Sequence, residues 1–422
     1  MGVIAEWRRL SGLLLLVFCM PGHAADLAGF ITDLYGGEGI RLPPAPDIPA
    51  NIADAHVPHF TGEQQIAQLN ALSNGLLSGV GVFALNSTVT GISFDLSQGV
   101  PVTTQDSLGP LLAERATTVG EGRLTFGFGY SKQKFDELDG RSLDDIEVTL
   151  IHQDCCVVGP PPIPPPDGQR TGFELDTIML AIDIDLEQDI YAFFGNYGIS
   201  DRWDVGVVVP VVSVEARALS RAEVFLGEPT GGSVIGGNPV HSFELDDDVR
   251  FSETGGKKTG LGDVLLRSKY QLVSDDDGGP MDVSVLGQVT FPTGDEDDLL
   301  GTGETKYRAM LIASKTFGRV TPHANLAYEL ASSNSKLENL TYAVGFDARV
   351  TDRFTAAVDV LGRHNPHVDE IGNDVVDVAF AVKFNPFTNY NAPINAFVSV
   401  PLNDDGLRSD AIWGVGFDII LN

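Results

Sequence analysis

From Glu121 to the end of the chain, apolar residues recur at every second position in one segment after another. Tyr342, Val344 and Phe346, for example, alternate with Gly345 and Asp347. Successive side chains of a β-strand point to opposite faces, so each segment has one apolar face and one face of small or charged residues. Strands of about ten residues with this period are typical of a transmembrane β-barrel, apolar toward lipid and polar toward the lumen. The pattern occurs at residues 123–131, 178–187, 264–272, 342–350, 354–363, 376–384 and 413–421.

A soluble β-sandwich also alternates, with its apolar residues in a core instead of against lipid. The connections distinguish the two folds. Short connections at 200–202, 274–279, 317–319, 351–352 and 386–391 alternate with longer or acidic ones at 227–240, 294–304, 332–339, 364–373 and 403–409. Tight periplasmic turns that alternate with longer external loops are the outer-membrane pattern. We therefore predict an all-β protein, a transmembrane antiparallel barrel. Residues 122–152 and 171–198 should form one long hairpin that reaches beyond the membrane, with its tip at 153–170.

The strand count depends on the N-terminal region. Counting from Glu121 gives about twelve strands, an even number with both ends in the periplasm. A hairpin at 80–96 would raise the number to about fourteen if it joined the sheet. The preceding residues are rich in Pro, Gly and Ala, and Thr61-Gly62-Glu63-Gln64 resembles a helix capping box that would start a short helix. We assign residues 25–115 to a plug or a periplasmic segment and residues 116–422 to the barrel.

The first 24 residues have the features of a secretory signal peptide. Arg8 and Arg9 precede the apolar run 13–18, and Gly22-His23-Ala24 supplies small residues for cleavage. Export would carry the protein to the outer membrane of a Gram-negative-type bacterium. The expected partners there are outer-membrane lipid and the barrel-insertion machinery. We expect insertion by the usual route, although the chain ends on Leu421-Asn422 instead of the aromatic residue that this machinery commonly reads.

The composition limits the function classes. Lys and Arg number 27 against 58 Asp and Glu, a net charge of −31, which argues against nucleic acid as a partner because phosphate contacts need a surplus of Lys and Arg. A mean hydropathy near zero and the absence of a long apolar run look at first like a soluble protein. Alternation explains both, because every second residue of each strand faces the lumen.

One ordered set of motifs carries a family resemblance. Phe291, Pro292, Thr293, Gly294 and Asp295 are followed by Leu300-Gly301-Thr302-Gly303, and Gly262-Asp263-Val264 comes before them. This order resembles the outer-membrane barrel family named for the meta-pathway of phenol degradation, over roughly residues 200–420. The resemblance implies a barrel with an uptake-type role for small, often hydrophobic or aromatic compounds, and it supplies no catalytic residue. From the residues themselves, Pro292 ends strand pairing because it has no N–H, and Asp295 keeps the following loop solvated.

The predicted inner face carries charges of both signs. They form either a polar pathway that selects solutes by charge or an interior salt-bridge network that fills a narrow barrel. The candidate lumen-lining residues are Arg123, Asp183, Asp185, Glu187, Arg267, Lys269, His323, Glu329, Asp347, Arg349, Asp359, Arg363, Asp377, Lys383 and Asp418.

Other chemistry is weakly supported. Cys155 and Cys156 are adjacent near the predicted hairpin tip, which favours a vicinal disulfide in an oxidising compartment over a metal site that needs spaced ligands. A hydrolase would need a nucleophile beside a His such as His323, and the chain has no G-x-S-x-G motif. We therefore expect no enzyme activity, no catalytic residue, no metal and no cofactor.

These observations predict an outer-membrane channel or facilitator for passive uptake of small solutes, with hydrophobic or aromatic compounds as the expected class. The alternative is a closed structural or surface-interaction barrel that uses its acidic external loops and transports nothing. The predicted charge makes a preference for cations the first electrical property to test.

Overall fold

The computed structural model describes residues 112–152, 175–227, 248–367, 373–387 and 392–421, with shorter pieces at 27, 42, 60, 94–95, 102–103, 234–235, 238–239 and 241–243. The predicted signal peptide, the capping box at 61–64, the hairpin tip at 153–170 and the pair Cys155 and Cys156 lie outside these residues. In the part of the chain that is described, no helix is long and apolar enough to cross a membrane.

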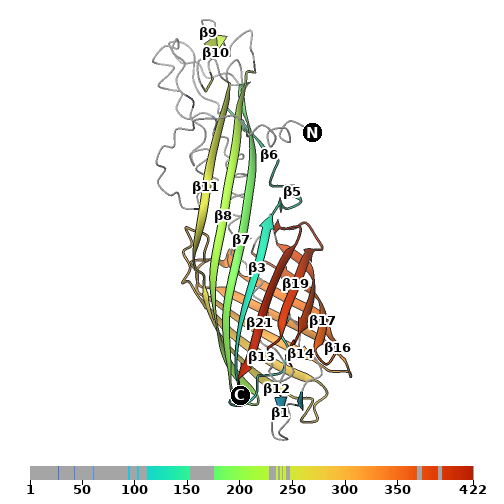
Figure 1. The fold of residues 1–422 in the computed structure, drawn as a ribbon. Coiled ribbons are helices and arrows are strands. Elements are labelled where there is room, and N and C mark those ends of the chain that lie inside the picture. The colour runs from blue at the N-terminus through green and yellow to red at the C-terminus, as the bar shows by residue number, and fades with distance from the viewer. Residues whose placement is uncertain are drawn as a thin grey trace.

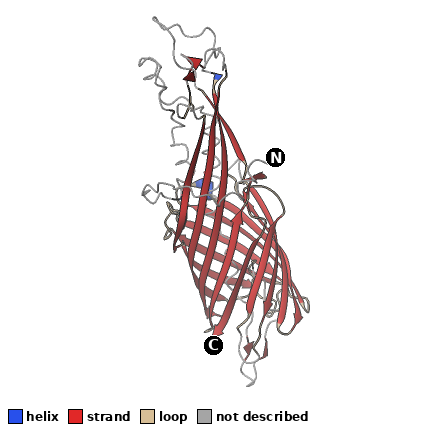
Figure 2. Ribbon diagram, turned by 45° about the horizontal axis from the view of Figure 1, so that its top comes forward, coloured by secondary structure: helices blue, strands red, loops and turns tan. Residues whose placement is uncertain are grey.

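The fold is an all-β transmembrane barrel closed by twelve antiparallel strands (Figures 1 and 2). Strand β3 pairs with the last strand, β21, on one side and with β7 on the other, and the β7–β8 pairing closes the ring. The lower of the two predicted strand numbers is confirmed. The barrel strands are β3 (Leu124–Phe135), β7 (Thr177–Ser200), β8 (Trp203–Phe225), β12 (Val264–Val273), β13 (Asp282–Phe291), β14 (Lys306–Ser314), β15 (Val320–Ala331), β16 (Asn339–Thr351), β17 (Phe354–His364), β18 (Asp374–Phe384), β19 (Ile394–Pro401) and β21 (Ile412–Leu421).

The barrel has one end of short turns and one end of long loops. Two residues join β7 to β8 and two join β16 to β17, whereas fourteen residues separate β13 from β14. The first barrel strand, β3, begins at the short-turn end and the last, β21, ends there, since Leu421 pairs with Leu124. The predicted alternation of short turns with long loops is confirmed.

Apolar side chains cover the outer face of the barrel, as contact with lipid requires. Large apolar residues that are 40–60% exposed point outward from successive strands: Phe126, Leu266, Tyr270, Leu311, Leu326, Val344, Phe346, Phe380, Val415 and Phe417. Tyr130 packs against Tyr191 and Trp413 near the long-loop end, with ring centroids 5.1 and 5.5 Å apart. Such aromatic residues are typical of the membrane–water interface.

Strands β7 and β8 continue far beyond this aromatic cluster (Figure 1). Their outer parts pair with each other and with two further strands, β6 (Ile146–Ile151) beside β7 and β11 (Val249–Leu261) beside β8. The result is a four-stranded extension in the order β6-β7-β8-β11. The predicted long hairpin is confirmed, although β3 leaves the sheet at Phe135 and the pairing resumes only at Ile146.

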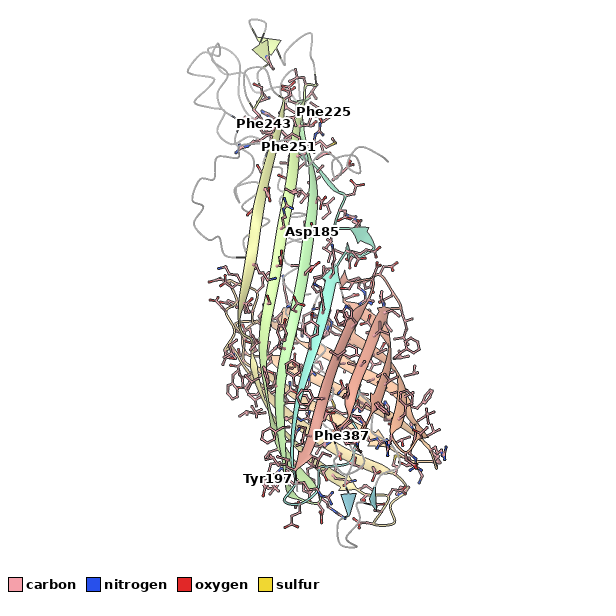
Figure 3. The ribbon with its side chains drawn as sticks, viewed as in Figure 1. Asp185, Tyr197, Phe225, Phe243, Phe251 and Phe387 are labelled. Carbon is pink, nitrogen blue, oxygen red and sulfur yellow. The ribbon has the colours of Figure 1, made fainter. Side chains whose placement is uncertain are left out.

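The outer faces of β7 and β8 change from apolar to charged or polar at the same height along the barrel axis. Below it the outer face carries Tyr191, Phe193 and Tyr197, and above it the same face carries Asp185 and Glu187 (Figure 3). In β8 the change falls between Val211 and Ser213, which pair with Tyr191 and Asp189 respectively. The two strands thus mark a common level at which lipid gives way to water.

The placement of Asp183, Asp185 and Glu187 in the lumen is therefore wrong. These residues lie on the outer, water-facing side of the extension, where Asp185 pairs with Lys134 and Glu187 with Lys132. The opposite side of β7 is the buried one, and it carries Ile178, Leu180, Ile182, Ile184 and Leu186. The extension keeps the predicted alternation of apolar and polar residues. Because no lipid surrounds the extension, its apolar face packs inward in a core, as in a soluble sheet.

That core also receives two residues from the N-terminal segment. Leu27 and Phe60 are each 1% exposed and pack in the same cluster as the inner face of β7 and β8. Phe60 lies edge-on to His152 and His241, with ring centroids 5.2 and 5.1 Å away. Leu27 and Phe60 of the N-terminal region thus lie at the long-loop end of the barrel.

Candidate functional site

The barrel encloses a chamber of about 300 Å³ in the half nearer the long loops. Its wall comes from the inner faces of strands all around the ring, and it is mixed in character. Apolar side chains such as Leu265, Leu286 and Leu361 alternate with charged ones such as Arg308 and Arg363. Its concave, mixed wall is of the kind that holds small molecules.

Residues 112–121 form the floor of this chamber and run toward the short-turn end. Glu114 pairs with Arg267 at 2.7 Å, and its backbone exchanges two hydrogen bonds with the Asn325 amide, at 2.7 and 2.9 Å. Further along, Thr118 and Val119 bond to the β7–β8 turn and to Asp204. Together with the side chains around them, these residues occupy the short-turn half of the lumen.

Arg115 secures the floor to the opposite wall. Its guanidinium donates to Asp347 at 2.7 Å, and both side chains are at most 3% exposed. His323 extends this cluster, with Nε2 2.6 Å from Asp359. Lys269, fully buried, donates to the Arg115 carbonyl at 3.2 Å. Removing one member of a buried ion pair costs about 3–5 kcal/mol, so the floor is held firmly.

The connection between β19 and β21 folds inward as a roof. Leu407, Arg408 and Ser409 are each less than 10% exposed and line the chamber. Strand β20 (Leu407–Arg408) pairs with β4 (Glu137–Leu138), which in turn pairs with β5 (Arg141–Ser142). The roof is thus a small three-stranded sheet built from two loops.

A pair of carboxyl groups joins the two loops of the roof. The Asp410 backbone N–H donates to the Asp136 carboxylate at 3.0 Å. Burial, the side-chain hydrogen bond to Asp410 and the negative charge of Asp410 raise the pKa of Asp136 to about 6. A group with this pKa titrates just below neutral pH.

Asp263 explains why the residues of the family motif occur together. It lies in the two-residue break between β11 and β12. Both strands pair with β8, β11 with its outer part and β12 with the part in the barrel. Its carboxylate accepts from the Gly294 N–H at 3.0 Å and from the Thr302 N–H and hydroxyl at 2.9 Å each. A Cβ on Gly301 would lie 2.8 Å from the Gly294 Cα, so only glycine fits there.

The motif therefore folds the β13–β14 loop over the barrel mouth. Thr293 donates to the Gly262 carbonyl at 2.6 Å and accepts from the Val264 N–H at 2.9 Å. Leu299 and Leu300 enter the core at the base of the extension. The preceding strand ends at Phe291, before Pro292, as the sequence predicts, while Asp295 stays in the loop and its carbonyl accepts from the Leu300 N–H.

The remaining predicted residues lie on the inner face in three groups. The first group belongs to the floor network and consists of Arg267, Lys269, His323, Asp347 and Asp359. The second group lines the chamber and consists of Glu329, Arg363 and Asp377, together with Arg267. Lys383 and Asp418 are buried on the wall of β18 and β21, Arg349 is half-buried on β16, and Arg123 lies partly exposed just before β3. The inner-face charges thus form an ion-pair network in the floor and line the chamber above it.

Several residues of the site were not predicted. Glu114 and Arg115 lie in a segment without any strand pattern, and Arg408 comes from a loop, so alternation could not indicate them. Arg308 does alternate with Tyr307 and Ala309 on β14 and could have been found by the same count.

One family model matches part of the chain. The family model described as "Putative MetA-pathway of phenol degradation" matches residues 179–362. The family resemblance is confirmed. The matched region runs from the extension to β17 and includes the motif around Asp263, although it ends earlier than the predicted range of 200–420. No curated protein matches the chain.

Solved structures with a similar fold include an outer-membrane channel from Pseudomonas putida F1, at 10% identity and a TM-score of 0.43, covering 73% of this chain and 99% of that one. A FadL homologue from Pseudomonas aeruginosa has 10% identity and a TM-score of 0.33, covering 71% and 89%. The toluene transporter TodX of P. putida has 9% identity and a TM-score of 0.32, covering 71% and 90%. At these values the comparisons add nothing to what the sheet topology already shows.

Proposed function

We propose that the protein is an outer-membrane channel for passive uptake of small solutes, with hydrophobic or aromatic compounds among them, and that it does no chemistry. The observation that carries this proposal is the chamber, a space on the barrel axis with a wall of both apolar and charged side chains. A barrel that served only as a scaffold would gain stability by filling this space.

The chamber has a floor and a roof, so passage needs at least one of them to move. The roof is held by short strand pairings and by one ion pair to the wall, Arg408–Asp377, whereas the floor is held by two buried ion pairs to two walls. We expect the roof to open more readily, because the floor must break Glu114–Arg267 and Arg115–Asp347 together.

The test is solute entry into liposomes that contain the full mature chain. A channel should admit a small neutral aromatic solute such as benzamide faster than protein-free liposomes do, and should exclude a solute several times the chamber volume. A correctly inserted protein that admits neither solute would contradict the channel.

The second candidate is a surface-interaction barrel, which the extension favours. Its outer face is a ladder of charges, including Lys134–Asp185, Arg217–Glu253 and Lys257–Glu215. Failure of solute entry, together with binding of cells or proteins to the extension, would support this alternative.

A further inference from the structure

Arg363 stands out among the charged residues of the chamber. It lies near the long-loop end of β17, on the inner face, beside Thr341 of β16 and Val375 of β18. Its side chain lines the chamber and is partly accessible from it. Among the described residues, no hydrogen bond or ion pair to its guanidinium is formed.

The carboxylates nearest to Arg363 already have closer partners. Asp377 accepts from Arg408 at 2.5 Å, and Glu329 accepts from Arg308 at 3.0 Å with Lys306 3.8 Å away. Arg363 lies within electrostatic reach of Asp377, Glu329 and Arg408.

The upper chamber therefore has more cations than carboxylates. The whole lining has five cations, Arg267, Lys306, Arg308, Arg363 and Arg408, and four carboxylates, Glu114, Asp263, Glu329 and Asp377. Glu114 pairs with Arg267, and Asp263 accepts from N–H and hydroxyl donors of the β13–β14 loop. This surplus occurs in a chain with a net charge of −31, so it is a local feature of the chamber and opposite to the charge of the whole protein.

Apolar side chains lie beside these cations. Leu361 precedes Arg363 by two residues on the same face of β17, and Leu112 of the floor and Ile412 of β21 also line the chamber. A guanidinium binds a carboxylate through two parallel hydrogen bonds, and the leucines offer an apolar surface to the rest of a molecule.

We infer that the chamber binds a small monocarboxylate with an apolar body, such as an aromatic acid, with its carboxylate on Arg363. This inference rests on the proposed function and narrows its solute class. It also reverses the cation preference that the net charge predicts, because the field inside the chamber comes from its own lining.

The test measures binding and entry separately, with benzoate and its neutral isostere benzamide as probes. Binding to the full mature chain in detergent is followed by calorimetry, and entry by liposome swelling. Arg363→Met is compared with Arg353→Met, which removes the same charge from the exposed turn at the other end of β17. Unchanged thermal unfolding confirms that each variant is folded.

We expect benzoate to bind the unmodified protein and the Arg353→Met variant roughly tenfold or more tighter than benzamide, and this difference to vanish in Arg363→Met. Equal binding of the two probes, no benzoate binding, or an unchanged ratio in Arg363→Met would each overturn the inference. Should Arg363→Met not fold, Arg363→Lys serves in its place, with weaker benzoate binding expected because an ammonium cannot make the paired contact.

The two proposals fail in different ways. Benzoate binding without entry of any solute would refute the channel and leave the binding site. Equal binding and equal entry of benzoate and benzamide would refute the site and leave the channel.

Discussion

At the scale of single residues, a few side chains hold the two loops of the roof together. Asp136 and Asp410 approach each other between these loops, and Glu137 and Arg408 lie close by. Two carboxyl groups at hydrogen-bond distance are stable together only when one carries a proton.

The pKa of about 6 for Asp136 gives a pH dependence of the roof. Because the folded value is raised above the usual value near 4, the contact stabilises the roof fully below pH 4 and this contribution is lost as the pH rises through about 6. The protection factors of residues 402–411, which are hydrogen-exchange rates corrected for the intrinsic pH dependence of exchange, should therefore be lower at pH 7.5 than at pH 5. Asp136→Asn should remove most of this difference, and a variant that keeps it would show that another group is responsible.

Asp263 shows how one residue connects distant parts of the sequence. Its carboxylate joins the break between β11 and β12 to residues more than thirty positions away in the β13–β14 loop. The sequence indicated the motif but could not indicate the contact, because the motif residues meet only after β12 and β13 have paired.

At the scale of elements, the environment outside a strand decides which of its faces is buried. Val207 and Leu219 lie on the same outer face of β8 and are 38% and 37% exposed. Val207 lies below the level of Val211, where lipid surrounds the barrel, and Leu219 lies above it, beside Asp183 of β7.

A lysine at each of these positions should have opposite consequences. Val207→Lys places a charge against the hydrocarbon and should destabilise the barrel by about 2–4 kcal/mol, whereas Leu219→Lys adds a charge to a water-facing ladder and should change stability little. Urea unfolding of both variants in lipid vesicles measures the difference. Equal losses would mean that the lipid boundary does not lie between these two residues.

At the scale of the whole molecule, the floor segment decides whether the lumen is open along its length. Deletion of residues 26–119 removes Glu114, Arg115 and the contacts of Thr118 and Val119. We expect single-channel conductance in planar bilayers to rise by a large factor, because the short-turn half of the lumen would fill with water.

A gentler variant keeps this prediction testable if the deletion does not fold. The double substitution Arg115→Met and Asp347→Asn removes one buried ion pair without leaving either charge alone, so stability should change little while openings become more frequent. Arg115→Met by itself leaves Asp347 buried without its guanidinium and should destabilise the protein. Unchanged conductance in both the deletion and the double variant would show that residues 112–119 do not limit passage.

Alternation and connection length by themselves determined the barrel, the count of twelve strands, the parity of its ends and the long hairpin. These features are local, since each follows from a period of two and from the turn residues between strands. Only the tertiary structure decided what each face meets. Asp185 and Asp377 follow the same sequence rule, yet Asp377 lines the chamber and Asp185 faces water, because one strand lies within the membrane and the other rises above it. The chamber likewise depends on closure of the ring, which brings a floor segment, an inward-folded loop and Arg363 together from distant parts of the chain.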